Sequence, residues 1–455
     1  MFLFPRTLLI FSSIVLFSMC PFQAHAKRVS NPDPSQLGRY AVGHTSYVVA
    51  NFEAQNRQVA VSVFYPAEAG NITSSTARAM YPLDPLSNVL SPLPSESWES
   101  LGYDPAYEAP APASDGPFPL LMVSVAWQGS AWMYIYFGTR LASHGYVVAV
   151  VEEFNDGQWP WLPSDPFSVE MLKRTQDVPF VLTDLLAESG AVGGLLKNTI
   201  DDTRIAISGH SLGGYGAYAL TVGDDLICDA TFIEGVFGYP LFPPGTCVPA
   251  AADPRIKALV SLDGASYNMK YEELARVRVP SLLLGETVEA LVAFEDIIGV
   301  GGTGIFKLWE ARPHAAIDRR DSYRVDIVGT NHFSYMNACD GFDLMNKVGI
   351  LSSANYENLR SSYLCPADLP DAVTHEIVTT YTVAFLNTHL RKAGRSKRDM
   401  SVLTNHYAKT HNVQFFRGER CHAARPDKES YFTYRPHPHE CVAAQKDPAG
   451  WFANP

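Results

Sequence analysis

The sequence lacks an excess of positive charge: 35 lysine and arginine residues stand against 47 aspartates and glutamates, for a formal net charge of −12. This balance argues against nucleic-acid partners and against anionic membrane surfaces. Beyond the first residues, no stretch is long and apolar enough for a transmembrane helix. The chain has no internal repeat, and none of its cysteines has the CxxC spacing of a zinc site. Its 455 residues, 47% of them hydrophobic, are enough for one large domain with insertions or for two modest ones.

The first 26 residues have the pattern of an export signal. Arg6 precedes an apolar stretch at 7–17, and Ala-His-Ala at 24–26 fits a signal-peptidase site. The apolar stretch is too short to span a bilayer comfortably. Cys20 offers a lipoprotein alternative, but Met19 stands where a small residue is needed. We therefore expect cleavage after residue 26 and a secreted or periplasmic protein.

The cysteines and two further motifs fit an exported chain. Six cysteines follow the expected signal, and an even number favours a disulfide framework. Their local grouping predicts the bridges Cys228–Cys247, Cys339–Cys365 and Cys421–Cys441, although other pairings stay open. Asn71 begins a glycosylation sequon, which matters only in a host that glycosylates exported proteins. His-Pro-His-Glu at 437–440 hints at a metal, but such histidines are more typical of surface loops, so no metal site is predicted.

Strand-like apolar runs alternate with segments of helical periodicity from residue 118 onward. Strands are expected at 59–65, 119–125, 146–151, 204–208, 256–262, 281–284 and 323–328, and helices at 133–143, 169–188, from 212, and at 372–392. This alternation predicts an α/β fold with a mostly parallel, doubly wound sheet.

The extent of the alternation gives the domain organisation. We expect a main domain at 27–392, with insertions at 70–117 and 222–255, and a polar, proline-rich C-terminal extension at 393–455 held by one disulfide. The first insertion has little periodicity, but its aromatic residues and leucines favour an ordered covering loop over a disordered linker.

A Gly-x-Ser-x-Gly motif occurs where an expected strand gives way to an expected helix. Ile205–Ser208 is a β-branched run, and Gly209-His210-Ser211-Leu212-Gly213 follows it. The bare motif is weak because it often arises by chance. Its placement is that of a nucleophile elbow, in which a sharp turn exposes the serine and the two glycines avoid crowding. Ser211 is therefore the candidate nucleophile.

The other members of a catalytic triad are expected downstream, at the carboxyl ends of strands, in the order acid then histidine. Asp263 follows the strand at 256–262 and is the candidate acid, and Glu286, after the next strand, is its rival. His332 follows the last strand and is the candidate base. His314 and His375 lie outside such a setting, and His210 is expected to pack the elbow. Read alone, an Asp-Gly pair is more often a turn and a loop histidine more often polar surface, so the joint order carries the prediction.

The oxyanion donors and the substrate contacts are expected on the loops around the elbow. The backbone amide of Leu212 is one expected donor, and that of Trp127, or else of Ala126, is the other. Four aromatic residues near the expected site are candidates for lining an apolar pocket, and an ordinary core position is the alternative for each; they are Trp132, Phe154, Trp159 and Trp161.

Several segments resemble the secreted platelet-activating-factor acetylhydrolases and the related dienelactone-hydrolase-like esterases of the α/β-hydrolase fold. The matching motifs lie between about 40 and 390: Tyr40-Ala41-Val42-Gly43-His44, Val63-Phe64-Tyr65-Pro66-Ala67, Leu141–Val148, Arg174–Leu182, the elbow, and Leu262-Asp263-Gly264. The resemblance implies an acid at Asp263 rather than Glu286 and a base at His332. The chain departs from this family in having Val125-Ala126 where His-Gly is common, in its insertions at 85–117 and 222–255, and in its 393–455 extension.

The residues and the resemblance together predict a secreted serine hydrolase that cleaves carboxylic esters through an acyl-enzyme, without metal or organic cofactor. Its expected partner is a small-molecule or lipid ester, with short-chain esters and acetylated phospholipids favoured. A lipase or polyester hydrolase is one alternative. An amidase or peptidase using the same triad is another, because triad geometry does not separate esters from amides. A non-catalytic binding protein on this fold is the third.

Overall fold

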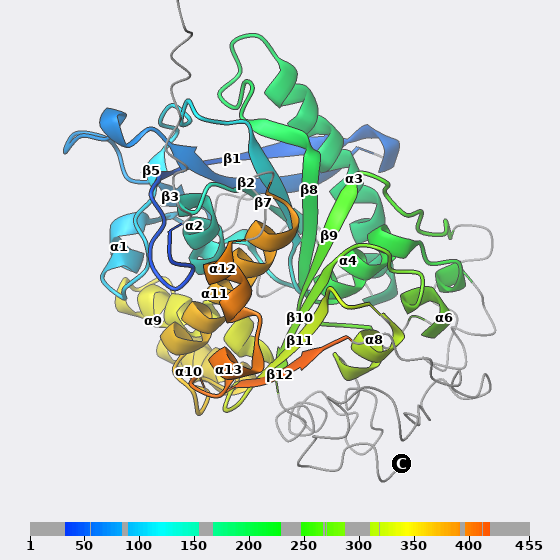
Figure 1. Cartoon of the computed structure of the whole chain (residues 1–455). Coiled ribbons are helices and arrows are strands. Elements are labelled where there is room, and N and C mark those ends of the chain that lie inside the picture. The colour runs from blue at the N-terminus through cyan, green and yellow to red at the C-terminus, as the bar shows by residue number, and fades with distance from the viewer. Residues whose placement is uncertain are drawn as a thin grey trace, which may run out of the picture. The chain divides into compact units, whose positions relative to one another are not determined.

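A ten-stranded sheet organises the described part of the chain in the computed structural model (Figure 1). The structure describes residues 32–54, 56–83, 90–153, 167–228, 247–266, 269, 271–286, 310–317, 319–391, 396–411 and 413–418. The order of the strands across the sheet is β12-β11-β10-β9-β8-β6-β7-β2-β1-β5. Their bounds are β1 (Ala41–Asn51), β2 (Arg57–Ala67), β5 (Tyr107–Glu108), β6 (Phe118–Ser124), β7 (Val147–Glu153), β8 (Ile200–Ser211), β9 (Ile256–Gly264), β10 (Ser281–Glu286), β11 (Ser322–Ile327) and β12 (Val413–Arg417).

The centre of the sheet is parallel. Strands β7, β6, β8, β9, β10 and β11 pair in parallel, whereas β2 runs antiparallel to both β1 and β7. Strand β6 is buried along its whole length, as expected for a parallel strand covered on both faces. The carboxyl ends of β8, β9, β10 and β11 therefore meet at one edge of the sheet, where functional loops gather in such folds.

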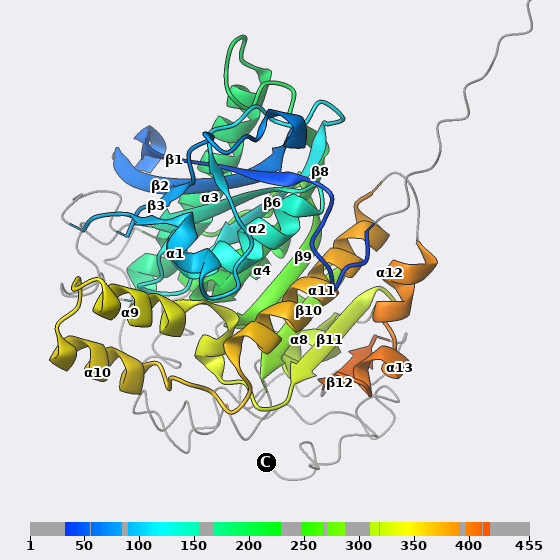
Figure 2. The same ribbon diagram turned by 90° about the vertical axis from the view of Figure 1, so that its left-hand side faces the viewer.

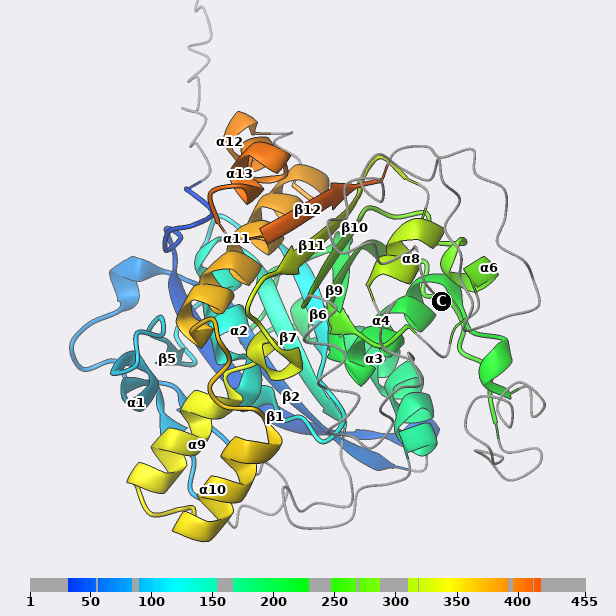
Figure 3. The same ribbon diagram turned by 90° about the horizontal axis from the view of Figure 1, so that it is seen from below.

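Helices cover both faces of the sheet and enclose two separate hydrophobic cores. Neighbouring strand residues alternate between them: Leu121 and Val148 belong to one core, and Leu120 and Val147 to the other. The first core is covered by α2 (Ile135–Ser143) and α11 (Asp371–His389). The second is covered by α3 (Phe167–Gly190), α4 (Leu212–Val222), α6 (Tyr271–Leu274) and α8 (Ala311–Ala316). Figures 2 and 3 show the sheet between these two groups of helices.

Shorter elements connect this frame. They are η1 (Phe52–Ala54), η2 (Ala69–Asn71), the two-strand ribbon β3 (Met80–Tyr81) and β4 (Leu93–Pro94), α1 (Ser95–Glu99), η3 (Ala131–Tyr134), η4 (Leu226–Cys228), η5 (His332–Tyr335), α9 (Ala338–Lys347), α10 (Ser353–Ser362), α12 (Lys397–Val402) and α13 (Asn405–Ala408). Among them, the helices α1, α9, α10, α12 and α13 were not predicted from the sequence.

The predicted fold class is confirmed. Every strand and helix expected from residue 118 onward is present, and the mostly parallel, doubly wound sheet with a serine turn between β8 and α4 is the α/β-hydrolase fold. The largest difference in extent is at the elbow strand, which was expected at 204–208 and spans Ile200–Ser211. It extends further because Phe118 and Pro119 of β6 pair with Ile200 and Asp201 before the register shifts.

The insertion and the extension both contribute to the main fold where they are described. In the 70–117 segment, Trp98 is fully buried in the core beneath α2, with its ring 6.5 Å from that of Tyr81. Where it is described, this segment is therefore packed against the main fold. In the expected extension, β12 pairs antiparallel with β11 and adds an edge strand to the sheet.

Two of the predicted disulfides are present. Cys228 is bonded to Cys247, and Cys339 to Cys365. Cys421 and Cys441 lie outside the described residues, as do the expected signal at 1–26 and the motif at 437–440. Such bonds are compatible with an oxidising, extracellular or periplasmic location. Within the described ranges, no helix has the length and apolar character needed to cross a membrane.

Candidate active site

Ser211 lies on a strained turn between strand and helix. It ends β8, α4 begins at Leu212, and its backbone φ of 54° lies in a region that serine rarely adopts. The turn is closely packed: an added Cβ at Gly209 would clash with the Gly213 carbonyl, and one at Gly213 with the Ser124 carbonyl. Both glycines are therefore required by close backbone approach, as predicted for a nucleophile elbow. Ser211 itself is only partly buried.

Asp263 lies beside this turn because of the strand register. Ser211 pairs with Gly264 across β8 and β9, and the Ala265 N–H donates to the Ser211 carbonyl at 2.7 Å. Asp263 also has a positive φ, 46°, although it is not glycine. The backbone of β9 thus turns sharply at Asp263, which lies beside the Ser211 turn.

The His332 imidazole and the Asp263 carboxylate are hydrogen-bonded. His332 opens η5 shortly after β11, and its Nδ1–H donates to Asp263 Oδ2. Both side chains are buried. With the proton on Nδ1, Nε2 has the lone pair that a general base needs. Burial lowers the pKa of His332 and raises that of Asp263, so burial favours the uncharged imidazole.

Glu286, the rival acid, is close to both residues. It ends β10, and one carboxyl oxygen of each acid and a ring nitrogen of His332 lie within 4.8 Å of one another. Burial first, and the charge of Asp263 second, raise the pKa of Glu286 well above its usual range. Neither of its carboxyl oxygens has a hydrogen-bond partner within normal geometry among the described residues. The hydrogen bond to His332 is therefore made by Asp263, and burial favours a proton on the neighbouring Glu286.

These three groups also have the spacing of a metal site, the only such cluster among the described residues. Their chemistry fits proton sharing better, because the Nδ1–H of His332 already bonds Asp263 and burial favours a proton on Glu286. We therefore assign no metal here.

A buried glutamate that the sequence analysis did not single out supports Asp263. One Glu310 oxygen accepts hydrogen bonds from the Ser261 hydroxyl at 2.6 Å and the Gly264 N–H at 2.8 Å. Its other oxygen accepts from the Tyr218 hydroxyl at 3.0 Å. Burial raises the pKa of Glu310 to about 8. These bonds hold both sides of Asp263 in β9, and no local sequence signal marks a glutamate 46 residues from Gly264 for this task.

The loop after β6 has the place of an oxyanion loop. The Gly129 N–H donates to the Ala126 carbonyl at 2.9 Å, which closes a turn in which Gln128 has a φ of 59°. The Ala126 N–H donates to the Tyr134 hydroxyl, so Trp127 is the better of the two expected donors. Trp127 is 40% exposed, whereas Leu212, the other expected donor, is buried at the start of α4. Helix N-termini leave amide N–H groups without intrahelical partners.

Arg174 is hydrogen-bonded to the loop after β6. Its guanidinium donates to the carbonyls of Val125, at 3.3 Å, and Ala126, at 3.0 Å, and it is 1% exposed. The same guanidinium forms an ion pair with Glu170, one turn earlier in α3, at 3.3 Å. Arg174 belongs to a segment noted above only as part of a resemblance, so its function in the loop was missed.

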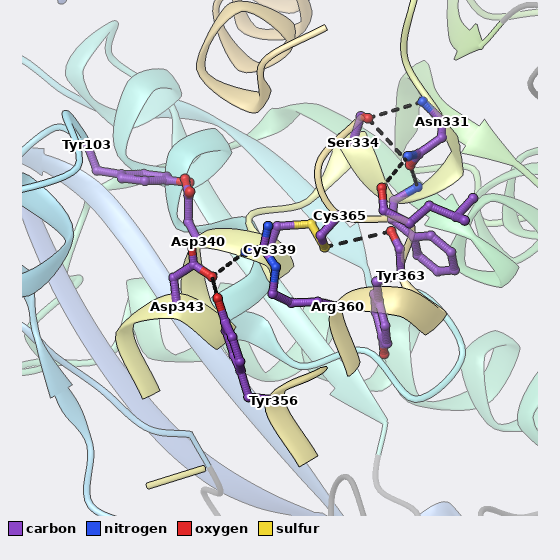
Figure 4. Close-up of a disulfide and its surroundings, with 12 residues drawn as sticks. Tyr103, Asn331, Ser334, Cys339, Asp340, Asp343, Tyr356, Arg360, Tyr363 and Cys365 are labelled. Atoms are coloured by element: carbon purple, nitrogen blue, oxygen red, sulfur yellow. Dashed lines mark hydrogen bonds and ion pairs between the residues drawn. A yellow bond between two sulfur atoms is a disulfide. The ribbon is translucent and has the colours of Figure 1, made fainter. Parts of the chain in front are cut away.

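The His332 loop is held by a cap and a disulfide (Figure 4). Asn331 caps η5 by accepting from the Phe333 N–H at 2.9 Å, and its amide donates to the Leu364 carbonyl at 3.0 Å. Leu364 is followed by Cys365, whose disulfide to Cys339 joins this segment to α9. The segment after α10 is therefore attached both to α9 and to the loop that carries His332.

The remaining predicted residues fall into three groups. Trp132 is buried in the core, with ring centroids 6.0 Å from Trp98 and 6.3 Å from Phe342, and it also lines a cavity of about 220 Å³. Phe154, Trp159 and Trp161 lie outside the described residues. Among the other histidines, His314 is buried in α8, and His375 stacks on Tyr136 at 3.7 Å in the α11 core. His210 packs under the elbow as expected, with its ring 4.9 Å from that of His332.

The fold and these residues define an α/β-hydrolase-fold protein with a serine elbow beside a buried histidine–aspartate pair. No family model matches the chain, and no curated protein sequence matches it. Among solved structures, it is similar in fold to a ferulic acid esterase from Streptomyces cinnamoneus, with 18% sequence identity and a TM-score of 0.48. That match covers 82% of this chain and 95% of the other.

Proposed function

We propose that this protein is an exported serine hydrolase that cleaves carboxylic esters. The observation that carries the proposal is the buried hydrogen bond from His332 Nδ1 to Asp263, next to a serine on a positive-φ strand-to-helix turn. A serine hydroxyl is a weak nucleophile unless a base accepts its proton as it attacks. His332 supplies the base, and Asp263 keeps its second nitrogen unprotonated.

The first half of the proposed reaction forms an acyl-enzyme. Ser211 Oγ attacks the ester carbonyl carbon while its proton passes to His332 Nε2. The carbonyl oxygen becomes an oxyanion that accepts hydrogen bonds from the backbone amides of Leu212 and Trp127. When this intermediate collapses, the bond to the leaving oxygen breaks and His332 returns the proton to that oxygen. The alcohol leaves, and the acyl group stays on Ser211.

The second half releases the acid. Water attacks the acyl carbon and passes one proton to His332. The second tetrahedral intermediate then expels Ser211 Oγ, which takes the proton back from the imidazole. The carboxylic acid departs and the enzyme is restored, with no net change in its protons. These groups complete the cycle without calling on a cofactor.

Short-chain esters, including acetylated phospholipids, are the substrates we propose first. This choice rests on the resemblance of several motifs to the platelet-activating-factor acetylhydrolase-like esterases, and export rests on the signal pattern at 1–26. The partly exposed Trp127, in the loop after β6, is a candidate apolar contact for the acyl or alcohol group.

The first test compares the purified protein with Ser211→Ala on p-nitrophenyl esters of increasing acyl length. We expect turnover to be highest on short chains and to fall by about 10⁴-fold or more in the variant, because the nucleophile is lost. A serine-reactive phosphonate should label the natural protein and leave the variant unlabelled, with the adduct on Ser211 by mass spectrometry.

Three results would contradict or redirect the proposal. Activity that survives Ser211→Ala excludes this mechanism. Faster cleavage of matched p-nitroanilides than of esters favours an amidase. The absence of both turnover and phosphonate labelling favours a binding protein on a hydrolase fold.

A further inference from the structure

A buried pair of side chains joins three loops of the candidate site. The Ala126 N–H, in the loop after β6, donates to the Tyr134 hydroxyl at 3.0 Å. Tyr134 Oη and His210 Nδ1, next to Ser211, are also 3.0 Å apart. His210 Nε2 lies 2.9 Å from the backbone carbonyl of His332. We call Tyr134 and His210 the bridge.

The hydrogen bonds of the bridge fix the protons on both side chains. The His332 carbonyl only accepts, so His210 Nε2 carries the proton and Nδ1 has a lone pair. Tyr134 must then donate its hydroxyl proton to Nδ1, which leaves the hydroxyl oxygen to accept from Ala126. Donors and acceptors match only when His210 is neutral. Burial first, and His332 second, lower the pKa of His210 well below its usual range, which favours that form.

The bridge connects segments that the sheet alone does not hold together. Tyr134 ends η3, just after the oxyanion loop, while His210 is 76 residues away and the His332 carbonyl a further 122. Tyr134 and His210 are fully buried, so water cannot easily replace their hydrogen bonds. The two ends of the bridge are hydrogen-bonded to backbone atoms, the Ala126 N–H and the His332 carbonyl. A shift of one loop would therefore displace the other.

We propose that Tyr134 and His210 are positioning residues that hold the oxyanion loop, the Ser211 elbow and the His332 loop in mutual alignment. The inference rests on the proposed ester hydrolysis, in which nucleophile, base and oxyanion donors act on one carbonyl group. Misplacement by a fraction of an ångström weakens oxyanion and proton-transfer interactions that form in the transition state. Binding of the substrate in the ground state depends less on this alignment.

The chain supplies a matched control. Tyr136, two residues from Tyr134, is also buried, and its hydroxyl donates to the Tyr335 carbonyl at 2.8 Å, in the same histidine-bearing segment η5. Tyr134→Phe and Tyr136→Phe therefore remove the same atom from neighbouring buried positions. Only the first breaks the connection to Ala126 and His210. A merely structural function for Tyr134 would make the two variants equivalent.

The experiment measures kcat and KM on p-nitrophenyl acetate, with phosphonate titration to count folded active sites. We expect Tyr134→Phe to lower kcat by about 10- to 100-fold with KM within about twofold, and Tyr136→Phe to change either by less than about threefold. At His210, glutamine can still donate to the His332 carbonyl and leucine cannot. The glutamine variant should therefore retain a higher kcat than the leucine variant. Equal losses of kcat in the two tyrosine variants would overturn the inference.

Hydrogen–deuterium exchange separates this inference from the proposed function. Tyr134→Phe should speed amide exchange in peptides covering both 125–131 and 330–337, whereas Tyr136→Phe should leave exchange in 125–131 unchanged. Unchanged exchange at 125–131 in Tyr134→Phe would disprove the bridge whether or not the protein turns over esters. Loss of ester turnover and labelling in the natural protein, with this exchange pattern intact, would reject the function and leave the bridge supported.

Discussion

At the scale of single residues, the site contains three buried carboxyl groups that have different contacts. Asp263 bonds His332, Glu286 lies beside Asp263, and Glu310 accepts hydrogen bonds from residues on either side of Asp263. Burial raises the pKa of all three carboxyls. Closely spaced carboxylates do not all ionise readily in such surroundings, so we expect Glu286 to be neutral and Asp263 to be the acceptor for His332.

Replacing each acid by its isosteric amide tests whether Asp263 or Glu286 is the acid that supports His332. In Asp263→Asn, the amide no longer offers a carboxylate to His332 Nδ1–H, and we expect kcat at pH 7 to fall by about 10³- to 10⁴-fold. In Glu286→Gln, a neutral acid becomes a neutral amide of the same shape, and kcat should stay within about threefold. Kinetics on p-nitrophenyl acetate measure both, and the opposite ranking would make Glu286 the acid.

Backbone strain at the site is another feature of this scale. Of the seven non-glycine residues with positive φ among those described, three are Gln128, Ser211 and Asp263, on the three loops that surround the expected reaction centre. A fourth, Leu364, accepts the hydrogen bond from Asn331 beside His332. Strain of this kind persists only where surrounding packing imposes it. Here that packing includes the Gly209–Gly213 contact, Glu310 and Arg174.

At the scale of elements, the His332 loop depends on helices that lie between the last parallel strand and α11. The η5 turn is joined to the segment after α10 through Asn331 and Leu364, and that segment is joined to α9 by Cys339–Cys365. Phe333 adds a ring contact to Tyr363 at 4.6 Å. His332 is thus held by a disulfide-closed helical pair rather than by the sheet alone.

Removing this disulfide should affect both stability and catalysis. Its cysteines are 26 residues apart, so Cys339→Ala/Cys365→Ala should lose about 3 kcal/mol of unfolding free energy in urea. We also expect kcat on p-nitrophenyl acetate to drop several-fold well below the melting temperature, because the segment holding Asn331 loosens. Cys228→Ala/Cys247→Ala, which opens a loop of 19 residues, is the control, and it should lose similar stability without that effect on kcat. Equal kcat in the two double variants would show that the first disulfide does not support His332.

At the scale of the whole molecule, one sheet brings the site together. Ser211, Asp263 and Glu286 lie at or next to the ends of β8, β9 and β10, and His332 follows β11 by a few residues. Burying several carboxyl groups at this edge makes the stability of the fold depend on pH. A carboxyl whose pKa is raised by folding contributes stability below its unfolded pKa and loses that contribution as the pH rises through the folded value.

Glu286→Gln should therefore become more stable relative to the natural protein as the pH rises. From the unfolded pKa near 4.5 upward, the difference in unfolding free energy should grow by about 1.4 kcal/mol per pH unit while folded Glu286 keeps its proton. Urea unfolding at pH 5 and pH 8 measures this difference. Glu357→Gln, on the exposed surface of α10, is the control for replacing a glutamate by glutamine. A difference for Glu286→Gln that stays constant with pH would mean that Glu286 is ionised in the folded protein.

Much of the frame could be predicted because it depends on local spacing. The alternation of apolar runs and helical segments places the strands and helices from 118 onward, and two disulfides follow from the grouping of their cysteines. By contrast, β12 is a short Val-Gln-Phe-Phe-Arg run outside the region of alternating strands and helices, and it pairs antiparallel with β11 at the edge of the sheet. The helix α10 was missed because its apolar residues are few and their periodicity is weak. The helix α9 is instead amphipathic, with Phe342, Leu344 and Met345 buried, so its spacing did offer a helical signal.

The sequence by itself determined that a serine sits on a strand-to-helix turn and that two acids and a histidine follow at strand ends. Those features depend on residues adjacent in the chain. Only the tertiary structure decided that Asp263 rather than Glu286 bonds His332, since strand order and register set the distances between their side chains. It alone also brought together Tyr134 and His210, and Glu310 and Gly264. Hydrogen bonds between residues so distant in sequence form only when the packed sheet has already set their positions.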